Sequence, residues 1–208
     1  APSQPWTEED AAAVWAAFET LLPQVEMVCL CGSSPAPAAD ALFFDMIQAA
    51  NRRGLLTLLD SYGSGLKNGL RAAPTMLKMN QQEAEDFLGF EISAENSLHM
   101  ALRELQAQSR SAQVIITCGQ SGAVMLAADH FYQAEALKLE VVNTIGCGDA
   151  FTAGSIVGLL QGLKDRECFQ LSMAAASANT LTWQPGKVDP AEVYRLIEKV
   201  NINRNNHR

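Results

Sequence analysis

The sequence predicts an α/β fold, with a mostly parallel sheet that is covered by helices on both faces. Short continuous apolar runs alternate with longer amphipathic segments, which is the pattern of βαβ units. These apolar runs lack an alternating polar face, as expected for strands that are buried on both sides. Polar or glycine-containing segments follow the ends of several runs, where the ligands of open α/β sheets bind. Loops from separate strands are therefore expected to converge on one edge of the sheet.

Strands are expected wherever a short apolar run is bounded by turn residues. Two of the later runs are separated only by Ala128-Asp129-His130, which predicts a hairpin. The expected strands are 27–31, 55–60, 75–78, 114–117, 123–127 and 131–133.

Helices are expected from amphipathic periodicity and from capping residues. Thr7 precedes three acids, which is typical of an N-cap and a first helical turn. Gly54 and Gly89 are expected C-caps, and Ser93 an expected N-cap. The expected helices are 11–22, 40–53, 81–88 and a helix that ends at 109, followed by a mostly helical chain from 149 to 200 with breaks near 162–164 and 184–186.

Composition fits a globular domain of 208 residues, with 48% hydrophobic and 18% charged residues. The net charge of -8 argues against a nucleic-acid surface, and no apolar run approaches the roughly 20 residues of a membrane span. The five cysteines are odd in number and include no C-x-x-C, which favours reduced thiols and a cytoplasmic location. Cys29 and Cys31 share one face of a strand and are poorly placed to bridge each other. The three histidines show no metal-ligand spacing.

The segment Gly146-Cys147-Gly148-Asp149 is the most informative feature of the chain. Its glycines allow a tight turn, and the apolar run that follows predicts a helix whose N-terminus offers free N–H groups. Such a turn binds an anion, most plausibly a phosphate. A carboxylate beside that site fits a base that accepts a proton from an attacking hydroxyl.

Residues 143–154 resemble the second signature of the ribokinase-like (PfkB) sugar kinases, D/N-T-x-G-A-G-D-x-F-x-A-G. The Asn-Thr opening is similar to the branch of 1-phosphofructokinase and tagatose-6-phosphate kinase. Cys147, Met79 and Ser34 depart from the Ala, Pro and Leu of the family patterns, and none of them removes a side chain that the family uses for chemistry. Four further motifs resemble those of this branch in the same order, namely Gly32-Ser-Ser-Pro35, Leu59-Asp-Ser-Tyr-Gly63, Lys78-Met-Asn-Gln-Gln-Glu83 and Thr117-Cys-Gly-Gln-Ser-Gly122.

The resemblance implies a ribokinase-like fold and transfer of the ATP γ-phosphoryl group to a sugar or sugar-phosphate hydroxyl. By this resemblance Asp149 is the base, and Gly146, Cys147 and Gly148 supply backbone donors. The other implied roles are nucleotide binding by Thr117, Gly119, Gly122, Asn179 and Gly186, sugar binding by Gly32, Ser33 and Asp60, and Mg²⁺ binding by Asn80 and Glu83.

Family members are longer, and this chain begins about where their first third has ended. The expected organisation is therefore a single C-terminal portion of a kinase domain, 1–208, that lacks the family's N-terminal strands and lid. Residues 1–6 resemble a linker, and the tail 201–208 is expected to be frayed. An uncovered sheet edge is expected to promote homo-oligomers.

Each motif also has a structural alternative. The Gly146 turn with Asp149 can be a strand-to-helix turn with a cap, Asn80 and Glu83 an ordinary helix start, and residues 117–122 a simple turn. Asn179 can be a surface residue, and Asp60 can be a carboxylate that ties down a loop. At the level of function, the alternatives are a kinase for an unphosphorylated sugar or nucleoside, and a non-catalytic nucleotide-binding or regulatory domain. A Rossmann dehydrogenase is disfavoured, because no G-x-G-x-x-G follows an early strand.

Overall fold

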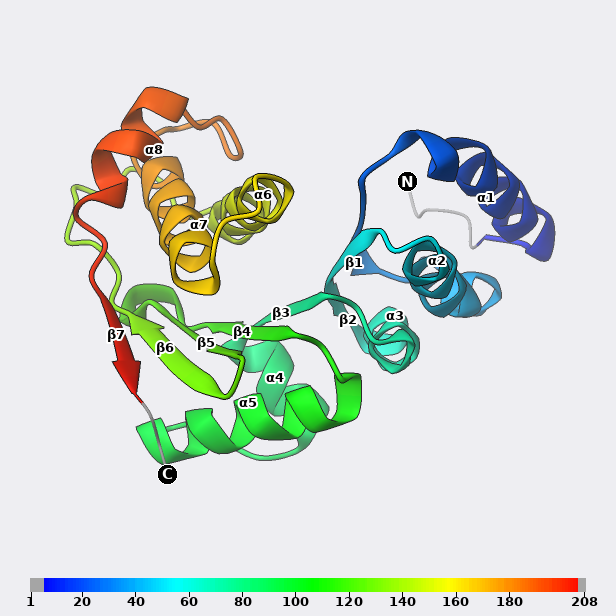
Figure 1. Cartoon of the computed structure of the whole chain (residues 1–208), viewed down its shortest axis with the longest axis horizontal. Coiled ribbons are helices and arrows are strands. Elements are labelled where there is room, and N and C mark those ends of the chain that lie inside the picture. Colours follow the sequence, from blue (N-terminus) through cyan, green and yellow to red (C-terminus); the bar gives the residue numbers. More distant parts are fainter. Residues whose placement is uncertain (1–5, 206–208) are drawn as a thin grey trace. The chain divides into compact units, whose positions relative to one another are not determined.

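The computed structural model describes residues 6–205, which fall into two compact units (Figure 1). Unit 1 comprises residues 6–79 and 104–112, and unit 2 comprises residues 80–103 and 113–205. Within this described range, no helix combines the length and the apolar character that a membrane-spanning segment requires.

Unit 1 is built on parallel strands, with β1 pairing with β2 and β2 with β3. The helices α2 and α3 lie beside β1 and β2, and α1 packs near α2 (Figure 1). The register sets Cys31 opposite Asp60 and Asp60 opposite Lys78, so these three side chains form a row on one face of the sheet. The elements are α1 (Glu8–Leu21), β1 (Met27–Ser33), α2 (Asp40–Arg52), β2 (Leu56–Tyr62), α3 (Gly63–Gly69) and most of β3 (Met76–Asn80).

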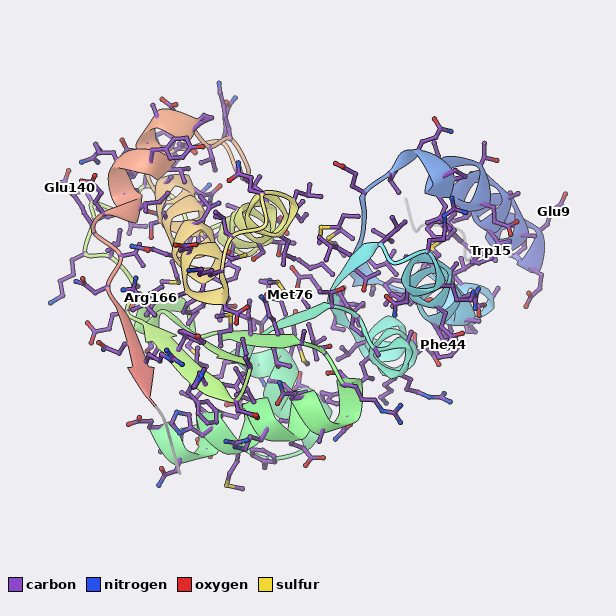
Figure 2. All side chains as sticks on the ribbon, in the orientation of Figure 1. Glu9, Trp15, Phe44, Met76, Glu140 and Arg166 are labelled. Atoms are coloured by element: carbon purple, nitrogen blue, oxygen red, sulfur yellow. The ribbon has the colours of Figure 1, made fainter. Side chains whose placement is uncertain are left out.

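Apolar side chains hold the helices of unit 1 in place. Trp15 and Phe18 on α1 pack against a cluster that includes Val28 of β1 and Ala50 of α2 (Figure 2). The start of α1 is fixed by a capping box, in which the Thr7 hydroxyl accepts from the Asp10 N–H and the Asp10 carboxylate accepts from the Thr7 N–H.

Unit 2 is built on antiparallel strands, in the order β4, β5, β6, β7. Helices α6 to α8 cover one face of these strands, and α4 with the start of α5 covers the other (Figure 1). The elements are α4 (Gln81–Leu88), α5 (Glu95–Ser109, of which 95–103 lie in this unit), β4 (Gln113–Thr117), β5 (Ala123–Ala127), β6 (His130–Ala134), α6 (Cys147–Leu160), α7 (Asp165–Asn179), α8 (Pro190–Ile197) and β7 (Ile202–Asn205).

Small residues bring α6 and α7 into close contact. A Cβ on Gly158 would lie 2.6 Å from the Sγ of Cys168, and one on Gly154 would lie 2.8 Å from the Cα of Ser172. The hydroxyls of Ser155 and Ser172 hydrogen-bond across the same interface at 2.8 Å. This packing aligns the N-terminus of α6 with the C-terminus of α7, where the candidate site lies.

The α/β class is confirmed, as are the hairpin of β5 and β6 and the helix that ends before Gly89. Two elements were not expected from the sequence: α3, inside the segment that follows β2, and β7. The expectation that the tail is frayed is wrong for 202–205, because these residues pair with β6. Ser93 does not begin α5, which starts at Glu95. Residues 1–5 of the linker-like start and residues 206–208 of the tail lie outside the described residues.

Candidate active site

The turn at Gly146 forms the N-terminus of α6. Gly146 is the N-cap and has a φ of 82°, a conformation that favours glycine. Cys147, Gly148 and Asp149 then form the first helical turn, with Gly148 and Asp149 exposed to solvent. The N–H groups of a first turn lack partners within the helix and attract anions. The exposed Asp149 carboxylate therefore lies at the N-terminus of a helix, at the position where the sequence predicts an anion site.

Asn143 shapes the approach to this turn. Its Oδ1 accepts from the Ile145 N–H at 3.0 Å, and its Nδ2 donates to the Trp183 carbonyl at 3.1 Å. The backbone N–H groups of Val142 and Asn143 both donate to the carbonyl of Thr180. The segment that leads into the turn is therefore attached to the chain that follows α7.

Asn179, the last residue of α7, joins the turn to a second loop. Its Nδ2 donates to the Ile145 carbonyl at 2.8 Å and lies 3.3 Å from the Sγ of Cys147. Its Oδ1 accepts from the Gly186 N–H at 2.8 Å. The residue is 1% exposed. Its amide thus satisfies backbone groups of two loops instead of lying at the surface.

The two loops also approach each other directly. A Cβ added to Gly146 would lie 2.9 Å from the backbone nitrogen of Gly186 and 3.2 Å from the Cβ of Pro185. Glycine is therefore required at position 146 both by the positive φ and by the close contact with the second loop. The structure brings together four of the predicted site residues in this way: Gly146, Cys147, Asn179 and Gly186.

A hollow of about 570 Å³ opens beside this cluster. The indole of Trp183 lines it and is 81% exposed, which is unusual for so large an apolar ring. Asp189 both lines the hollow and caps α8, since its Oδ1 accepts from the Ala191 N–H. The remaining lining residues are Thr182, Gln184, Lys187 and Val188.

The predicted nucleotide motif at 117–122 forms a tight turn between β4 and β5. The Cys118 N–H donates to the Gly122 carbonyl at 2.7 Å. Gly122 is buried with a φ of 92°, and a Cβ there would lie 2.0 Å from the Ala134 carbonyl oxygen. Gly119 is exposed, and a Cβ there would meet nothing within 4 Å. Gly122 is thus required by packing, while Gly119 and the half-buried Thr117 remain available to a ligand.

Asn80 and Glu83, the predicted Mg²⁺ pair, form a capping box at the start of α4. The Glu83 N–H donates to Asn80 Oδ1 at 2.9 Å, and the Asn80 N–H donates to Glu83 Oε2 at 2.8 Å. The two side chains therefore cap the start of a helix, which is the structural alternative to Mg²⁺ binding. Among residues 6–205, no group of three or more His, Cys, Asp or Glu side chains is arranged to hold a metal ion.

The predicted sugar-binding residues belong to unit 1. Gly32 and Ser33 are exposed at the end of β1, and Gly32 has a φ of 84°. The Asp60 carboxylate accepts from the Lys78 ammonium at 2.7 Å, and the two side chains are only 14% and 5% exposed. Asp60 thus belongs to a buried ion pair, which supports its reading as a structural carboxylate.

Sequence reasoning missed three residues around the Gly146 turn. Asn143 was noted only as part of a signature, and Thr180 and Trp183 were not considered. Asn143 acts through its side-chain amide, Thr180 through its backbone carbonyl and Trp183 through its exposed ring. The partners and the exposure that define these roles follow from tertiary structure and leave no pattern in the sequence. The only signal in the sequence was Pro185-Gly186, because a Pro-Gly dipeptide marks a turn and Trp183 lies just before it.

Residues 5–190 match the model of the pfkB family of carbohydrate kinases. The chain is 30% identical to 1-phosphofructokinase of Haemophilus influenzae over 178 residues, which cover 85% of this chain and 56% of the relative. It is 28% identical to 1-phosphofructokinase of Escherichia coli K12 over 198 residues, or 93% of this chain and 63% of the relative. The chain thus spans less than two thirds of the length of these curated relatives.

A solved structure has the same fold. Phosphofructokinase-2 from Escherichia coli, in complex with potassium, superposes with a TM-score of 0.85 over 96% of this chain and 64% of that chain, at 20% identity. The ribokinase-like architecture expected from the signature at 143–154 is therefore confirmed.

Proposed function

The chain belongs to the pfkB family of carbohydrate kinases, and on that premise we propose that it is part of an ATP-dependent sugar-phosphate kinase. The observation that carries the proposal is the turn at Gly146, where the exposed Asp149 stands on the first turn of α6. The reaction is transfer of the γ-phosphoryl group of ATP to a hydroxyl of the sugar phosphate.

In the proposed mechanism Asp149 accepts the proton of the attacking hydroxyl. Bond formation to the nucleophile is slight in a loose transition state, so an ordinary carboxylate suffices as the base. The backbone N–H groups of Gly148 and Asp149 would stabilise the charge on the transferred group, because they are held in place before the reaction begins. Asn179 contributes indirectly, since it fixes the carbonyl of Ile145 just before the turn.

Mg²⁺ is implied by the family, and Asn80 with Glu83 are the proposed residues that hold it. The donors are hard oxygens, which Mg²⁺ prefers, and one oxygen from each side chain is already used in the capping box. Glu83 has a second carboxylate oxygen, and Mg²⁺ commonly keeps several waters, so the pair fits an ion held mainly through water. When bound, the ion would neutralise phosphate charge.

The nucleotide is proposed to use unit 2. The hollow at 182–189 adjoins Gly186 and offers the face of Trp183 to a base, while Thr117 and Gly119 offer an exposed turn. Asn179 is proposed to shape this region instead of contacting adenine, because its amide already bonds to Ile145 and Gly186.

The substrate class is proposed from the relatives named 1-phosphofructokinase. Gly32 and Ser33 are the proposed residues on the sugar side, and Asp60, which is paired with Lys78, is proposed to support that side as a structural carboxylate. A kinase for an unphosphorylated sugar or nucleoside would use the same Asp149 chemistry. We also propose that the protein forms homo-oligomers. Its proposed location is the cytoplasm, where ATP is abundant.

A second candidate is nucleotide binding without phosphoryl transfer. It is favoured by the placement of the Gly146 turn, Asn179 and the hollow at 182–189 together in unit 2. Calorimetry with Mg-ADP on the 208-residue chain tests the nucleotide site that both candidates share. Absence of binding to a cooperatively folded sample would contradict both.

Phosphoryl transfer is tested in a version of the protein extended to the length of the relatives. Asp149→Asn should leave folding and ADP binding intact and lower the turnover by roughly 10²- to 10⁴-fold. Cys147→Ala is the matched control in the same turn, and near-normal turnover is expected. If Asp149→Asn transfers phosphate at the parent rate under saturation, Asp149 is not the base. ADP binding with no transfer by the extended parent protein would select the second candidate.

A further inference from the structure

Two thiols of unit 1 lie close together outside the residues proposed for kinase chemistry. Cys29 and Cys31 are two positions apart on β1, and their Sγ atoms are 3.4 Å apart. Alternate residues of a strand point to the same face, so the backbone holds both sulfurs on one side of the sheet. Cys31 is exposed and Cys29 is half-buried. The pair is therefore preformed and open to solvent on one side.

Charged groups lie in the same part of the face. Cys31 is opposite Asp60 in the neighbouring strand, and Asp60 is paired with Lys78. The hydrogen bond with Cys31, followed by burial, raises the pKa of the Cys29 thiol. Cys29 is therefore protonated at neutral pH, and an electrophile that binds both sulfurs must displace that proton.

The geometry selects what the two sulfurs can hold. The Cα atoms of residues two apart in a strand are separated by about 6.6 Å, which is close to the upper limit for a disulfide. A disulfide between Cys29 and Cys31 is therefore disfavoured. With bonds of about 2.3 Å, the length of a zinc–sulfur bond, sulfurs 3.4 Å apart subtend an angle of about 95° at a shared atom. A linear two-sulfur ion would need them about 4.6 Å apart. A structural zinc site is also excluded in residues 6–205, because no third ligand is in place.

We propose that Cys29 and Cys31 form a dithiol site for a trivalent arsenical, a soft centre with bent bonds that accepts two thiolates. A monosubstituted arsonous acid would lose both hydroxyls as water, as two As–O bonds break and two As–S bonds form. The thiol protons leave with those hydroxyls, and arsenic stays trivalent, so no oxidant or reductant is needed. This site does not depend on the proposed kinase activity.

The other cysteines are matched controls. Burial raises the pKa of Cys118 and of Cys168 to about 11, and each is remote in sequence from the other thiols. Cys147 is half-buried and lies beside the amide of Asn179. A single thiol holds an arsenical through one bond only, and excess monothiol displaces it.

The test uses phenylarsine oxide with the reduced 208-residue chain in the presence of excess glutathione. Mass spectrometry should show one phenylarsenic adduct that maps to 27–33 and that a small dithiol removes. Cys31→Ser, at an exposed position where the fold is expected to persist, should abolish the adduct, and Cys29→Ser should do the same. Cys118→Ser and Cys147→Ser should retain it.

Thermal unfolding provides a second measurement, because a ligand that binds the preformed pair of the folded state more tightly than the unfolded chain raises the melting temperature. The parent chain should melt at a higher temperature with phenylarsine oxide, and Cys31→Ser should show no shift. An adduct that persists in Cys31→Ser, or a folded parent chain that forms none, would overturn the proposal. A Cys29–Cys31 disulfide as the sole product in reduced buffer would overturn it as well.

Discussion

The side chain of Asn179 joins two backbone segments that contribute to the candidate site. Removing it would leave the Ile145 carbonyl and the Gly186 N–H without their partner. Ile145 and Gly186 are exposed residues, so each lost hydrogen bond should cost about 0.5–1.5 kcal/mol, the net contribution of a typical hydrogen bond. We therefore expect Asn179→Ala to lower the free energy of unfolding by that amount for each bond and to weaken Mg-ADP binding.

Hydrogen exchange separates this role from general destabilisation. The Gly186 N–H should exchange faster in Asn179→Ala, while amides of β4 and β5 stay protected. Asn201→Ala, at an exposed position, serves as the control and should change neither stability nor exchange. Unchanged protection of Gly186 in Asn179→Ala would show that the loop is held by other contacts.

The buried ion pair of Lys78 and Asp60 should make a measurable contribution to the free energy of unfolding. Lys78 is 4% exposed, so removal of either partner leaves a charge in a poorly solvated place. Breaking a buried pair in this way costs about 3–5 kcal/mol. Lys78→Met and Asp60→Asn should each destabilise unit 1 strongly in urea unfolding.

The double variant distinguishes a true pair from two independent contributions. Lys78→Met with Asp60→Asn removes both charges, so its cost should be clearly smaller than the sum of the single costs. Additive effects of the two substitutions would mean that the carboxylate and the ammonium do not depend on each other.

At the scale of elements, the turn between β4 and β5 depends on one of its two glycines. A Cβ at Gly122 would meet the Ala134 carbonyl oxygen at 2.0 Å, and the backbone there has a φ of 92°. Gly119 has a φ of 55° and open space around it. Gly119→Ala should cost about 1–2 kcal/mol from the left-handed backbone alone.

Gly122→Ala should cost more than Gly119→Ala, because the backbone of β6 must move as well. Comparison of the two midpoints in urea tests this difference, with circular dichroism as the check that both variants fold. Equal midpoints would mean that the β6 segment shifts without cost.

Elements with strong local signals could be predicted from the sequence. The capping box at Thr7 and the Gly89 C-cap mark helices whose ends depend on adjacent residues. β7 could not be predicted, because its polar residues pair with β6 through backbone groups that only tertiary structure brings close. The α3 helix begins at a glycine and contains three, so its local propensity is low.

The candidate site shows the same limit. The tight turn at Gly146 and the helix that follows it were predictable, since a glycine pair before an apolar helix is a local pattern. The two hydrogen bonds of the Asn179 amide could not be predicted, because its partners Ile145 and Gly186 are brought close only by the packing of α6 against α7. Likewise, the sequence indicated Asp60 as a site residue, while its ion pair with Lys78 depends on strand register.

At the scale of the whole molecule, β1 is the first strand of its sheet, and within residues 6–205 only β2 pairs with it. An open strand edge presents unpaired N–H and carbonyl groups that another chain can use. We expect the 208-residue chain to self-associate through β1 of a second copy. Light scattering should show a mass that rises with protein concentration.

A charge on the open strand should suppress this association. Lysine on an edge strand disfavours pairing, because its charge would have to be brought against a second sheet. Ser33→Lys, at an exposed position of β1, should therefore shift the protein toward the monomer. Thr20→Lys adds the same charge to the exposed face of α1 and should leave the mass unchanged. A parent chain that stays monomeric at high concentration, or equal association by both variants, would show that copies do not pair through β1.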